Sequence, residues 1–418
     1  MPSMADFTDP AWLKARLQPL QTIASVDLES MSGAGGQSGD MQRIVMNFED
    51  KSKSTYVLKR TKENGESQSI TLGLAREGIF YNHHSEVFPS DSNFVAYLPQ
   101  VFFSEGDLEE GTKTILMEDL STAVQSGHLF GAGSPLNWGK DLTALTSGKG
   151  FNVEKLTVAR ITQLAFSAAA TLHASCWQHA GLNDVHWLRA SSWNRGEGRD
   201  SWVASQAHIA GMWTAVKAKI ANAEDGSHFL ACGESQDGVA WDPLVVDCLD
   251  ASIARASEEA HGWETFQSEI RTRPFTLVQG DFHPANMMLC LPEAGRGEDE
   301  PRLVLVDWEV VGVGSGPQEL GQYMISHTRP EVRAALERGA LEAYYKELVQ
   351  RNTAVAASLT WDACWEEYVA GGVGRWMWLL PLLARICPAK MAQYFHDQVK
   401  AFCQTHLITA DNVPLPRA

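Results

Sequence analysis

The sequence contains no run of about 18 apolar residues, the length that a membrane-spanning helix requires. Its first 17 residues also lack the apolar segment of a secretion signal, because Asp6, Lys14 and Arg16 interrupt them. The seven cysteines form no Cys-x-x-Cys pair and follow no regular spacing, which favours buried free thiols over a disulfide framework. We therefore expect a cytoplasmic protein that does not insert into membranes.

Positive charge is scarce, because 34 lysines and arginines stand against 51 aspartates and glutamates and give a formal net charge of −17. Nucleic acids and anionic membrane surfaces repel such a chain at long range, so we expect neither as a partner. A neutral or cationic small molecule is easier to recruit. The length of 418 residues exceeds that of one ordinary domain and favours two lobes with separate apolar cores.

Two short apolar runs, at residues 275–278 and 303–306, predict buried strands that each lead towards an acidic residue. Asp281 follows the first run and Asp307 follows the second. Asp281 and Asn286 have the D-x-x-x-x-N spacing of the catalytic loop of phosphoryl-transfer enzymes. Because Mg²⁺ prefers hard oxygen ligands, we expect Asn286 and Asp307 to bind it and Asp281 to orient or deprotonate a hydroxyl group.

The residues around these positions resemble two signatures of one superfamily. Gly280–Asn286 reads Gly-Asp-Phe-His-Pro-Ala-Asn, and Val306–Glu309 reads Val-Asp-Trp-Glu. These segments are similar to the G-D-x-H-P-x-N and D-W/F-E motifs of the aminoglycoside phosphotransferase and choline kinase-like superfamily, which includes ecdysteroid kinase-like proteins. Gln279 stands where the superfamily usually has His, at a position that supports the loop.

The resemblance implies an α+β, bilobal protein-kinase-like fold, with an antiparallel sheet in the N-terminal lobe and a mainly helical C-terminal lobe. Residues 1–118 would form the nucleotide-binding lobe, and residues 119–418 the lobe for catalysis and substrate binding. The resemblance also implies transfer of the γ-phosphoryl group of ATP, with Mg²⁺, to an alcohol group of a small molecule. No A-P-E motif or long activation segment follows Asp307, which disfavours a protein substrate.

In the first lobe, Lys59 ends a β-type run. The resemblance implies that Lys59 holds phosphates of ATP and pairs with Glu77 on the following helix, whereas a solvated surface pair is the alternative.

Two further segments provide candidate nucleotide-binding residues. Gly33, Gly35 and Gly36 lie in a glycine-rich segment that lets backbone N–H groups approach phosphate oxygens, although a flexible hairpin has the same composition. Glu118 and Asp119 lie in a segment that resembles the hinge of these kinases, where backbone groups meet the adenine edge.

The remaining patterns predict the surrounding elements. We expect an antiparallel pair of strands within residues 93–103 and 114–117, a loop or insertion at 121–150 and a hairpin excursion at 290–302. Apolar residues at helical spacing predict helices at residues 153–178, 209–221, 245–260, 332–351, 361–383 and 389–405.

Two features of these helices have a structural and a functional interpretation. His173 matches a helix position of the superfamily, but a core histidine is favoured over a metal ligand, because no second ligand is spaced with it. Aromatic residues near carboxylates suit a cation-binding site, but a buried aromatic stripe is the favoured interpretation. These aromatic residues are Trp361, Trp365, Tyr368, Trp376 and Trp378.

Two functions of different class remain open. The first is the small-molecule kinase, whose acceptor could be a choline-like, aminoglycoside-like, sugar or sterol-type alcohol. The second is a nucleotide-binding pseudokinase or scaffold without turnover. Loss of Lys59 or Asp307 would favour the second, and both residues are present.

Overall fold

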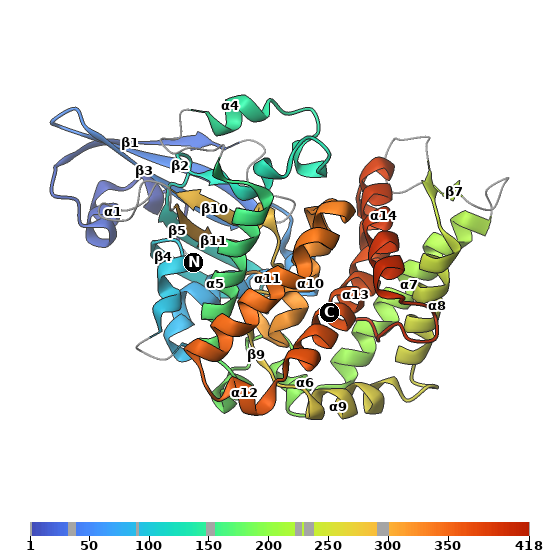
Figure 1. Cartoon of the computed structure of the whole chain (residues 1–418). Helices are drawn as coiled ribbons and strands as arrows, with labels where there is room; N and C mark the ends of the chain where they lie inside the picture. The colour runs from blue at the N-terminus through green and yellow to red at the C-terminus, as the bar shows by residue number, and fades with distance from the viewer. Residues whose placement is uncertain are drawn as a thin grey trace.

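The computed structural model describes residues 2–31, 39–88, 92–147, 155–221, 228–229, 238–290 and 301–417. Within these residues an antiparallel sheet of five strands lies beside a larger group of helices (Figure 1). The predicted α+β fold, with an antiparallel sheet in the N-terminal lobe and mainly helices in the C-terminal lobe, is confirmed. No helix in the described part of the chain is both long and apolar enough to cross a membrane.

The sheet has the strand order β1-β2-β3-β5-β4, and all neighbouring strands are antiparallel. Its strands span Ile23–Ser30 (β1), Gly39–Phe48 (β2), Lys53–Thr61 (β3), Val101–Asp107 (β4) and Thr112–Glu118 (β5). The predicted antiparallel pair is therefore formed by β4 and β5.

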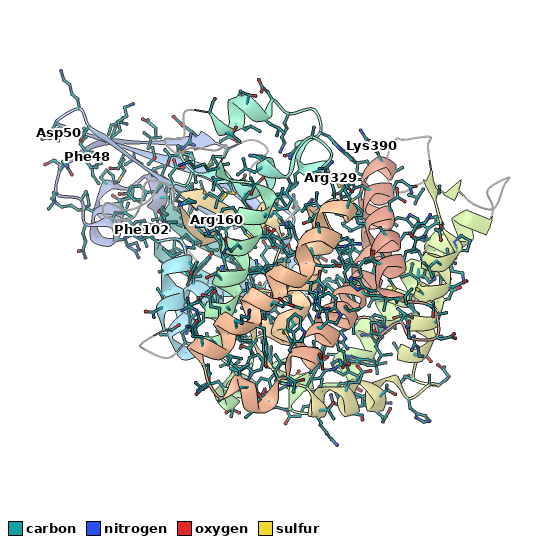
Figure 2. The ribbon with its side chains drawn as sticks, in the orientation of Figure 1. Phe48, Asp50, Phe102, Arg160, Arg329 and Lys390 are labelled. Carbon is teal, nitrogen blue, oxygen red and sulfur yellow. The ribbon has the colours of Figure 1, made fainter. Side chains whose placement is uncertain are left out.

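The two faces of the sheet pack against different helices. Leu58 points into a cluster that includes Leu13 of helix α1 (Pro10–Leu17). Because side chains alternate along a strand, Val57 and Lys59 lie on the opposite face, where Val57 joins the main core. In Figure 2, Phe48 and Asp50 mark the end of the β2–β3 hairpin, away from the helices of the second lobe.

Helices α2 (Glu66–Leu72) and α3 (Arg76–His83) connect β3 to the next strand. Helix α3 lies very close to β4, since a Cβ atom at Gly78 would be 2.3 Å from the Glu105 carbonyl oxygen. This contact fixes the neighbouring residue Glu77 against the face of the sheet that carries Lys59.

Two small sheets in the second lobe carry the candidate catalytic loops. Strand β10 (Met287–Cys290) is antiparallel to both β11 (Arg302–Leu305) and β6 (Val124–Gln125). Strand β9 (Thr276–Val278) is antiparallel to β12 (Gly312–Gly314). The pairing of β10 with β11 confirms the predicted hairpin, whose connecting residues lie outside the described residues.

Helices make up most of the second lobe, and the long helices that the sequence predicted are present with shifted ends. The helices span Leu142–Thr146 (α4), Val158–Ser175 (α5), Ser191–Asn194 (α6), Arg199–Ala221 (α7), Pro243–Ala256 (α8), Gly262–Thr272 (α9), Gly316–His327 (α10), Pro330–Arg351 (α11), Val355–Ser358 (α12), Trp361–Ile386 (α13) and Ala389–His406 (α14). A two-residue pair of strands, His228–Phe229 (β7) and Val239–Ala240 (β8), follows α7.

Helices α10 and α13 cross at glycines. A Cβ atom at Gly321 of α10 would lie 2.5 Å from the Tyr368 carbonyl oxygen, and one at Gly372 of α13 would lie 2.9 Å from the Cα atom of Gly321. The two backbones therefore touch, and Gln322 is held at a fixed distance from α13.

Two local predictions need correction. Residues 93–97, expected within a strand, form a 3₁₀ helix, because the Ser92 hydroxyl accepts a hydrogen bond from the Phe94 N–H at 3.3 Å. Phe94 is also fully buried against Phe88, and this packing outweighs the strand-like pattern. The expected loop at 121–150 contains β6, α4 and two 3₁₀ helices in its described part.

Candidate active site

The loop after β9 is fixed by a glycine and two buried charged residues. Gly280 has φ +85°, and a Cβ atom there would lie 2.3 Å from the Val310 carbonyl oxygen, so only glycine fits. The Gly280 carbonyl accepts a hydrogen bond from Arg375 Nη2 at 3.0 Å, and its N–H donates to Glu319 Oε1 at 2.5 Å. These contacts set the direction of Asp281, the next residue.

Three side chains donate hydrogen bonds to the Asp281 carboxylate. Oδ2 accepts from His283 Nε2 and Asn286 Nδ2, and Oδ1 accepts from Gln322 Nε2, each at 3.1 Å. Burial opposes ionisation of Asp281, but the charge and hydrogen bond of His283 outweigh it and hold the pKa well below its ordinary range. Asp281 is therefore a weak base with a fixed orientation.

Gln279 joins the two candidate loops. Its Nε2 donates to the carbonyl oxygens of Val306 at 3.1 Å and Asp307 at 2.7 Å, and its Oε1 accepts from the Asp281 N–H at 2.8 Å. Asp307 has φ +64°, a left-handed conformation that is uncommon for residues other than glycine. Gln279 thus stabilises a strained backbone directly beside the candidate metal ligand.

The Asp307 carboxylate uses one oxygen, Oδ1, to contact Lys59 Nζ at 2.8 Å, and 35% of its side chain is exposed. Burial raises the Asp307 pKa, and the charges of Glu309 and Glu77 add to this effect. Together they outweigh the opposite effect of Lys59 and raise the pKa to about 6.

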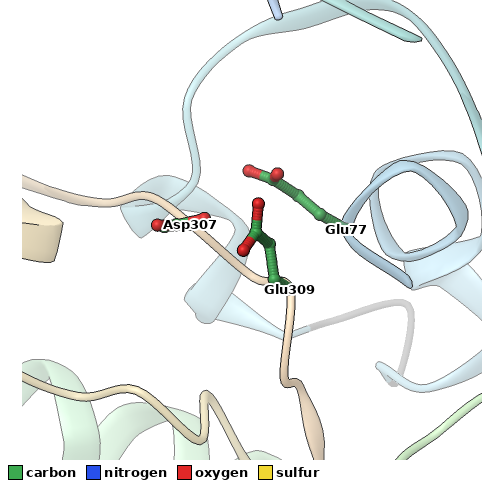
Figure 3. A group of neighbouring side chains, drawn as sticks. All are labelled: Glu77, Asp307 and Glu309. Carbon is green, nitrogen blue, oxygen red and sulfur yellow. The ribbon is translucent and has the colours of Figure 1, made fainter. Parts of the chain in front are cut away.

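Lys59 connects Asp307 to the first lobe. Its Nζ lies 2.7 Å from Glu77 Oε2 and 3.4 Å from Glu309 Oε1. Burial lowers the Lys59 pKa, but these carboxylates outweigh burial and raise it well above its ordinary value. Figure 3 shows the three carboxylates converging, Glu77 from a helix and Asp307 and Glu309 from one loop. The predicted Lys59–Glu77 pair is therefore a buried pair rather than a solvated one.

A second lysine, Lys113 of β5, completes this cluster and was missed from the sequence. Its Nζ lies 2.7 Å from Glu77 Oε2 and contacts Glu309 Oε1, and only 1% of its side chain is exposed. One signal could have revealed it: alternation along β5 places Lys113 on the same face as the buried Ile115 and Met117.

Two groups of side chains could hold a divalent cation. Oxygens of Glu77, Asp307 and Glu309 lie within 4.8 Å of one another, but the ammonium groups of two lysines already bind them. The predicted pair fits better. Asn286 donates both of its side-chain hydrogen bonds through Nδ2 to Asp281, which leaves its Oδ1 free to bind a cation, and Lys59 contacts only one Asp307 oxygen.

Of the other candidate nucleotide-binding residues, the structure describes Glu118 and Asp119. Glu118 accepts hydrogen bonds from Arg302 and from the Gln100 N–H, both at 2.8 Å. Asp119 pairs with Arg43 at 2.8 Å. Both carboxylates are thus occupied by protein partners. If this segment binds adenine, its backbone groups would make the contact. The predicted phosphate-binding glycines, Gly33, Gly35 and Gly36, lie outside the described residues.

The structural interpretations of the C-terminal lobe agree with the observed burial. His173 is fully buried, with hydrogen bonds to the Tyr344 hydroxyl at 2.8 Å and to Glu319 at 3.1 Å, so it is a core histidine. In the aromatic stripe, Tyr368 and Trp376 are buried.

Comparison with known proteins gives one family match. Residues 257–356, which contain both motifs, match the family described as the Ecdysteroid kinase-like family. No curated protein matches the sequence. The match covers only this part of the chain and agrees with the resemblance of the two motifs to the choline kinase and aminoglycoside phosphotransferase-like superfamily.

Solved structures of small-molecule kinases are similar to the chain at low sequence identity. Plasmodium vivax ethanolamine kinase shares 10% identity over 94% of this chain and 86% of that chain, with a TM-score of 0.48. An aminoglycoside phosphotransferase from Alicyclobacillus acidocaldarius shares 12% identity over 95% of both chains, with a TM-score of 0.40. A macrolide 2'-phosphotransferase from Brachybacterium faecium shares 13% identity over 94% of this chain and 96% of that chain, with a TM-score of 0.37.

Proposed function

We propose that the protein is an ATP- and Mg²⁺-dependent phosphotransferase that moves the γ-phosphoryl group to an alcohol group of a small molecule. The observation that carries this proposal is the convergence of Lys59, Glu77 and Asp307, which are far apart in the sequence, at distances of 2.7 and 2.8 Å. Binding of nucleotide phosphates requires a cationic side chain in a fixed position. Here Glu77 aligns the Lys59 ammonium group, and Asp307 lies beside it.

In this proposal the acceptor hydroxyl binds at Asp281. The hydroxyl oxygen forms a bond to the γ-phosphorus, and the bond from that phosphorus to the bridging oxygen of ADP breaks with its electron pair. Because the pKa of Asp281 is held low, this carboxylate orients the hydroxyl and accepts its proton only as the new bond forms. His283, Asn286 and Gln322 fix the orientation of the carboxylate.

Asn286 Oδ1 and Asp307 are the oxygen ligands that we assign to Mg²⁺. When bound, the ion would neutralise charge on the β- and γ-phosphates. Lys59 would hold phosphate oxygens, while Glu77 keeps the ammonium group in place. In the same proposal residues 1–118 bind the nucleotide and residues 119–418 bind the acceptor and carry the catalytic loop.

The test is a pair of measurements on the whole protein. Calorimetry measures ATP binding with and without Mg²⁺, and ADP release is then measured with a panel of amino alcohols, sugars, sterols, aminoglycosides, hydroxy acids and phosphorylated alcohols. We expect Mg²⁺-dependent ATP binding and ADP release that depends on one acceptor class. ATP binding without turnover on any acceptor would favour a pseudokinase or scaffold, and no ATP binding would exclude both functions.

A further inference from the structure

A cavity of about 140 Å³ opens beside the loop that carries Asp281. Gly280 and Gln322 line it, and these are the residue before Asp281 and a hydrogen-bond donor to its carboxylate. A molecule in this cavity could therefore place a hydroxyl at Asp281, which makes it a candidate acceptor site. Its walls also include Arg375.

Arg375 is a buried cation without a carboxylate partner. Only 8% of it is exposed, and its Nη2 donates to the Gly280 carbonyl, but its Nε has no hydrogen-bond partner in the described residues. No carboxylate of the described part of the chain lies within ion-pair distance of its guanidinium. Leaving a buried charged donor unpaired is strongly unfavourable, so an anion at this position would stabilise the protein.

A second arginine, Arg189, lies next to Arg375 across the Trp378 ring, outside the residues that line the cavity. The guanidinium carbons of Arg189 and Arg375 lie 5.4 and 5.2 Å from the centre of the Trp378 ring. Burial lowers the Arg189 pKa well below its ordinary value, and repulsion by Arg375 and Arg76 lowers it further. Arg189 also forms no ion pair and no side-chain hydrogen bond with the described residues. The two guanidinium groups thus repel each other, and attraction to Asp281 offsets part of this repulsion.

Other charges around the cavity are already balanced. Arg273 pairs with Glu367 at 2.7 Å, and Arg417 lies 3.5 Å from Glu269. Glu319, the carboxylate nearest the loop, is occupied by His173 and the Gly280 N–H. Beside the loop, two guanidinium groups without an ion pair in the described residues therefore face the single carboxylate of Asp281, so positive charge is in excess.

We propose that the acceptor is an alcohol with an anionic group, a carboxylate or a phosphate, which binds Arg375 while its hydroxyl reaches Asp281, and that Arg189 adds positive charge from behind the cavity wall. This inference rests on the proposed function, because it names the acceptor class of that site. The net charge of −17 favours a cationic ligand at long range. Salt screens charges beyond about 8 Å at physiological ionic strength, so the nearby guanidinium groups decide what binds in the cavity.

The experiment compares three two-carbon alcohols that differ in charge: glycolate, ethylene glycol and ethanolamine. Binding of each is measured by calorimetry at constant ionic strength, without nucleotide, for the wild type and for Arg375→Gln and Arg189→Gln. The exposed Arg338, which pairs with Glu342, provides the control variant Arg338→Gln that removes the same charge elsewhere. Inorganic phosphate is titrated in parallel to distinguish phosphate from carboxylate recognition.

We expect glycolate to bind at least about tenfold more tightly than ethylene glycol, because hydrogen bonds to a charged partner are the stronger ones. Arg375→Gln should lose this preference, Arg189→Gln should weaken it, and Arg338→Gln should keep it. Tighter binding of phosphate than of glycolate would indicate a phosphorylated alcohol. Ethanolamine binding as tightly as glycolate, or a preference retained in Arg375→Gln, would overturn the proposal.

Measurement of ADP release distinguishes a failure of this inference from a failure of the proposed function. If glycolate binds through the arginines but no acceptor yields ADP, the anion site stands and the kinase function fails. If Arg189→Gln lowers ADP release equally with anionic and neutral acceptors, the arginine acts on the phosphoryl group or the loop, and the inference about the acceptor is wrong.

Discussion

Asp281 combines a low pKa with three hydrogen-bond donors, and these two properties suit the orienting role that we propose for it. We expect Asp281→Asn to lower the rate of phosphoryl transfer about 10²–10⁴-fold, the usual contribution of such a group. ATP affinity should stay near normal, because in the proposed function the carboxylate would contact the acceptor and not the nucleotide. Single-turnover ADP formation together with ATP calorimetry checks this. A variant that keeps most of its rate would remove Asp281 from catalysis.

Asp307 carries both a charge and a strained backbone, and two substitutions separate them. Asp307→Asn keeps a residue type that tolerates φ +64°, whereas Asp307→Ala also loses that tolerance. Both should abolish the Mg²⁺-dependent part of ATP binding, but only the alanine variant should also lower the free energy of unfolding through the backbone. ATP titrations with and without Mg²⁺ provide the measurement. Equal Mg²⁺ dependence in wild type and both variants would exclude the ligand role.

Lys113 is fully enclosed between Glu77 and Glu309, so its removal leaves buried negative charge. We expect Lys113→Met to lower the free energy of unfolding by about 3–5 kcal/mol, the usual effect of breaking a buried ion pair. The exposed Lys53 gives a matched control in the same sheet, and Lys53→Met should change stability by less than about 0.5 kcal/mol. Urea unfolding followed by tryptophan fluorescence measures both. Similar values for the two variants would contradict a structural role of Lys113.

At the scale of elements, the glycine contact between α10 and α13 places Gln322 beside Asp281. Gly321→Ala should push the helices apart and lower the free energy of unfolding by about 1–3 kcal/mol. Gly339→Ala, on the exposed side of α11 where a Cβ meets nothing within 4 Å, should instead raise it by about 0.5–1 kcal/mol. Thermal unfolding compares the two. A stabilising effect of both alanines would show that the helices can separate without strain.

The elements with strong periodicity could be predicted from sequence, and those set by distant packing could not. The apolar runs before Asp281 and Asp307 and the long C-terminal helices gave correct predictions, because burial on one face imposes a regular pattern. The 3₁₀ helix at residues 93–97 was not predicted, because Phe94 is held by contacts with other parts of the chain.

In the candidate site, too, residues within local motifs could be predicted and residues with distant partners could not. Asp281, Asn286 and Asp307 were recognisable because each lies in a short local motif, Asp281 and Asn286 in the first and Asp307 in the second. Lys113 and Arg375 were missed, because their functional neighbours come from distant segments: Glu309 lies 196 positions from Lys113, and Gly280 lies 95 positions from Arg375. Local sequence patterns carry no information about such pairs.

At the scale of the whole molecule, Lys59 of the sheet and Asp307 of the helical lobe meet in one buried cluster. A nucleotide bound at this cluster would contact both lobes, so binding should stabilise the whole fold. We expect Mg-ATP at about 100 times its Kd to raise the free energy of unfolding by about 2.7 kcal/mol. Chelation of Mg²⁺ with EDTA should remove most of this gain in a thermal unfolding assay. An ATP effect that EDTA leaves unchanged would exclude a metal-dependent site.

The segment before the last residue also forms part of the cavity wall. Pro416 and Arg417 line it, Arg417 is 9% exposed, and its N–H donates to the Gly374 carbonyl at 2.9 Å. Exchange of Pro416 or Arg417 would therefore alter the shape of this cavity, although both residues lie far from Asp281 in the sequence. Loss of Arg417 would also remove positive charge beside Glu269 and Glu367, at 3.5 and 3.7 Å.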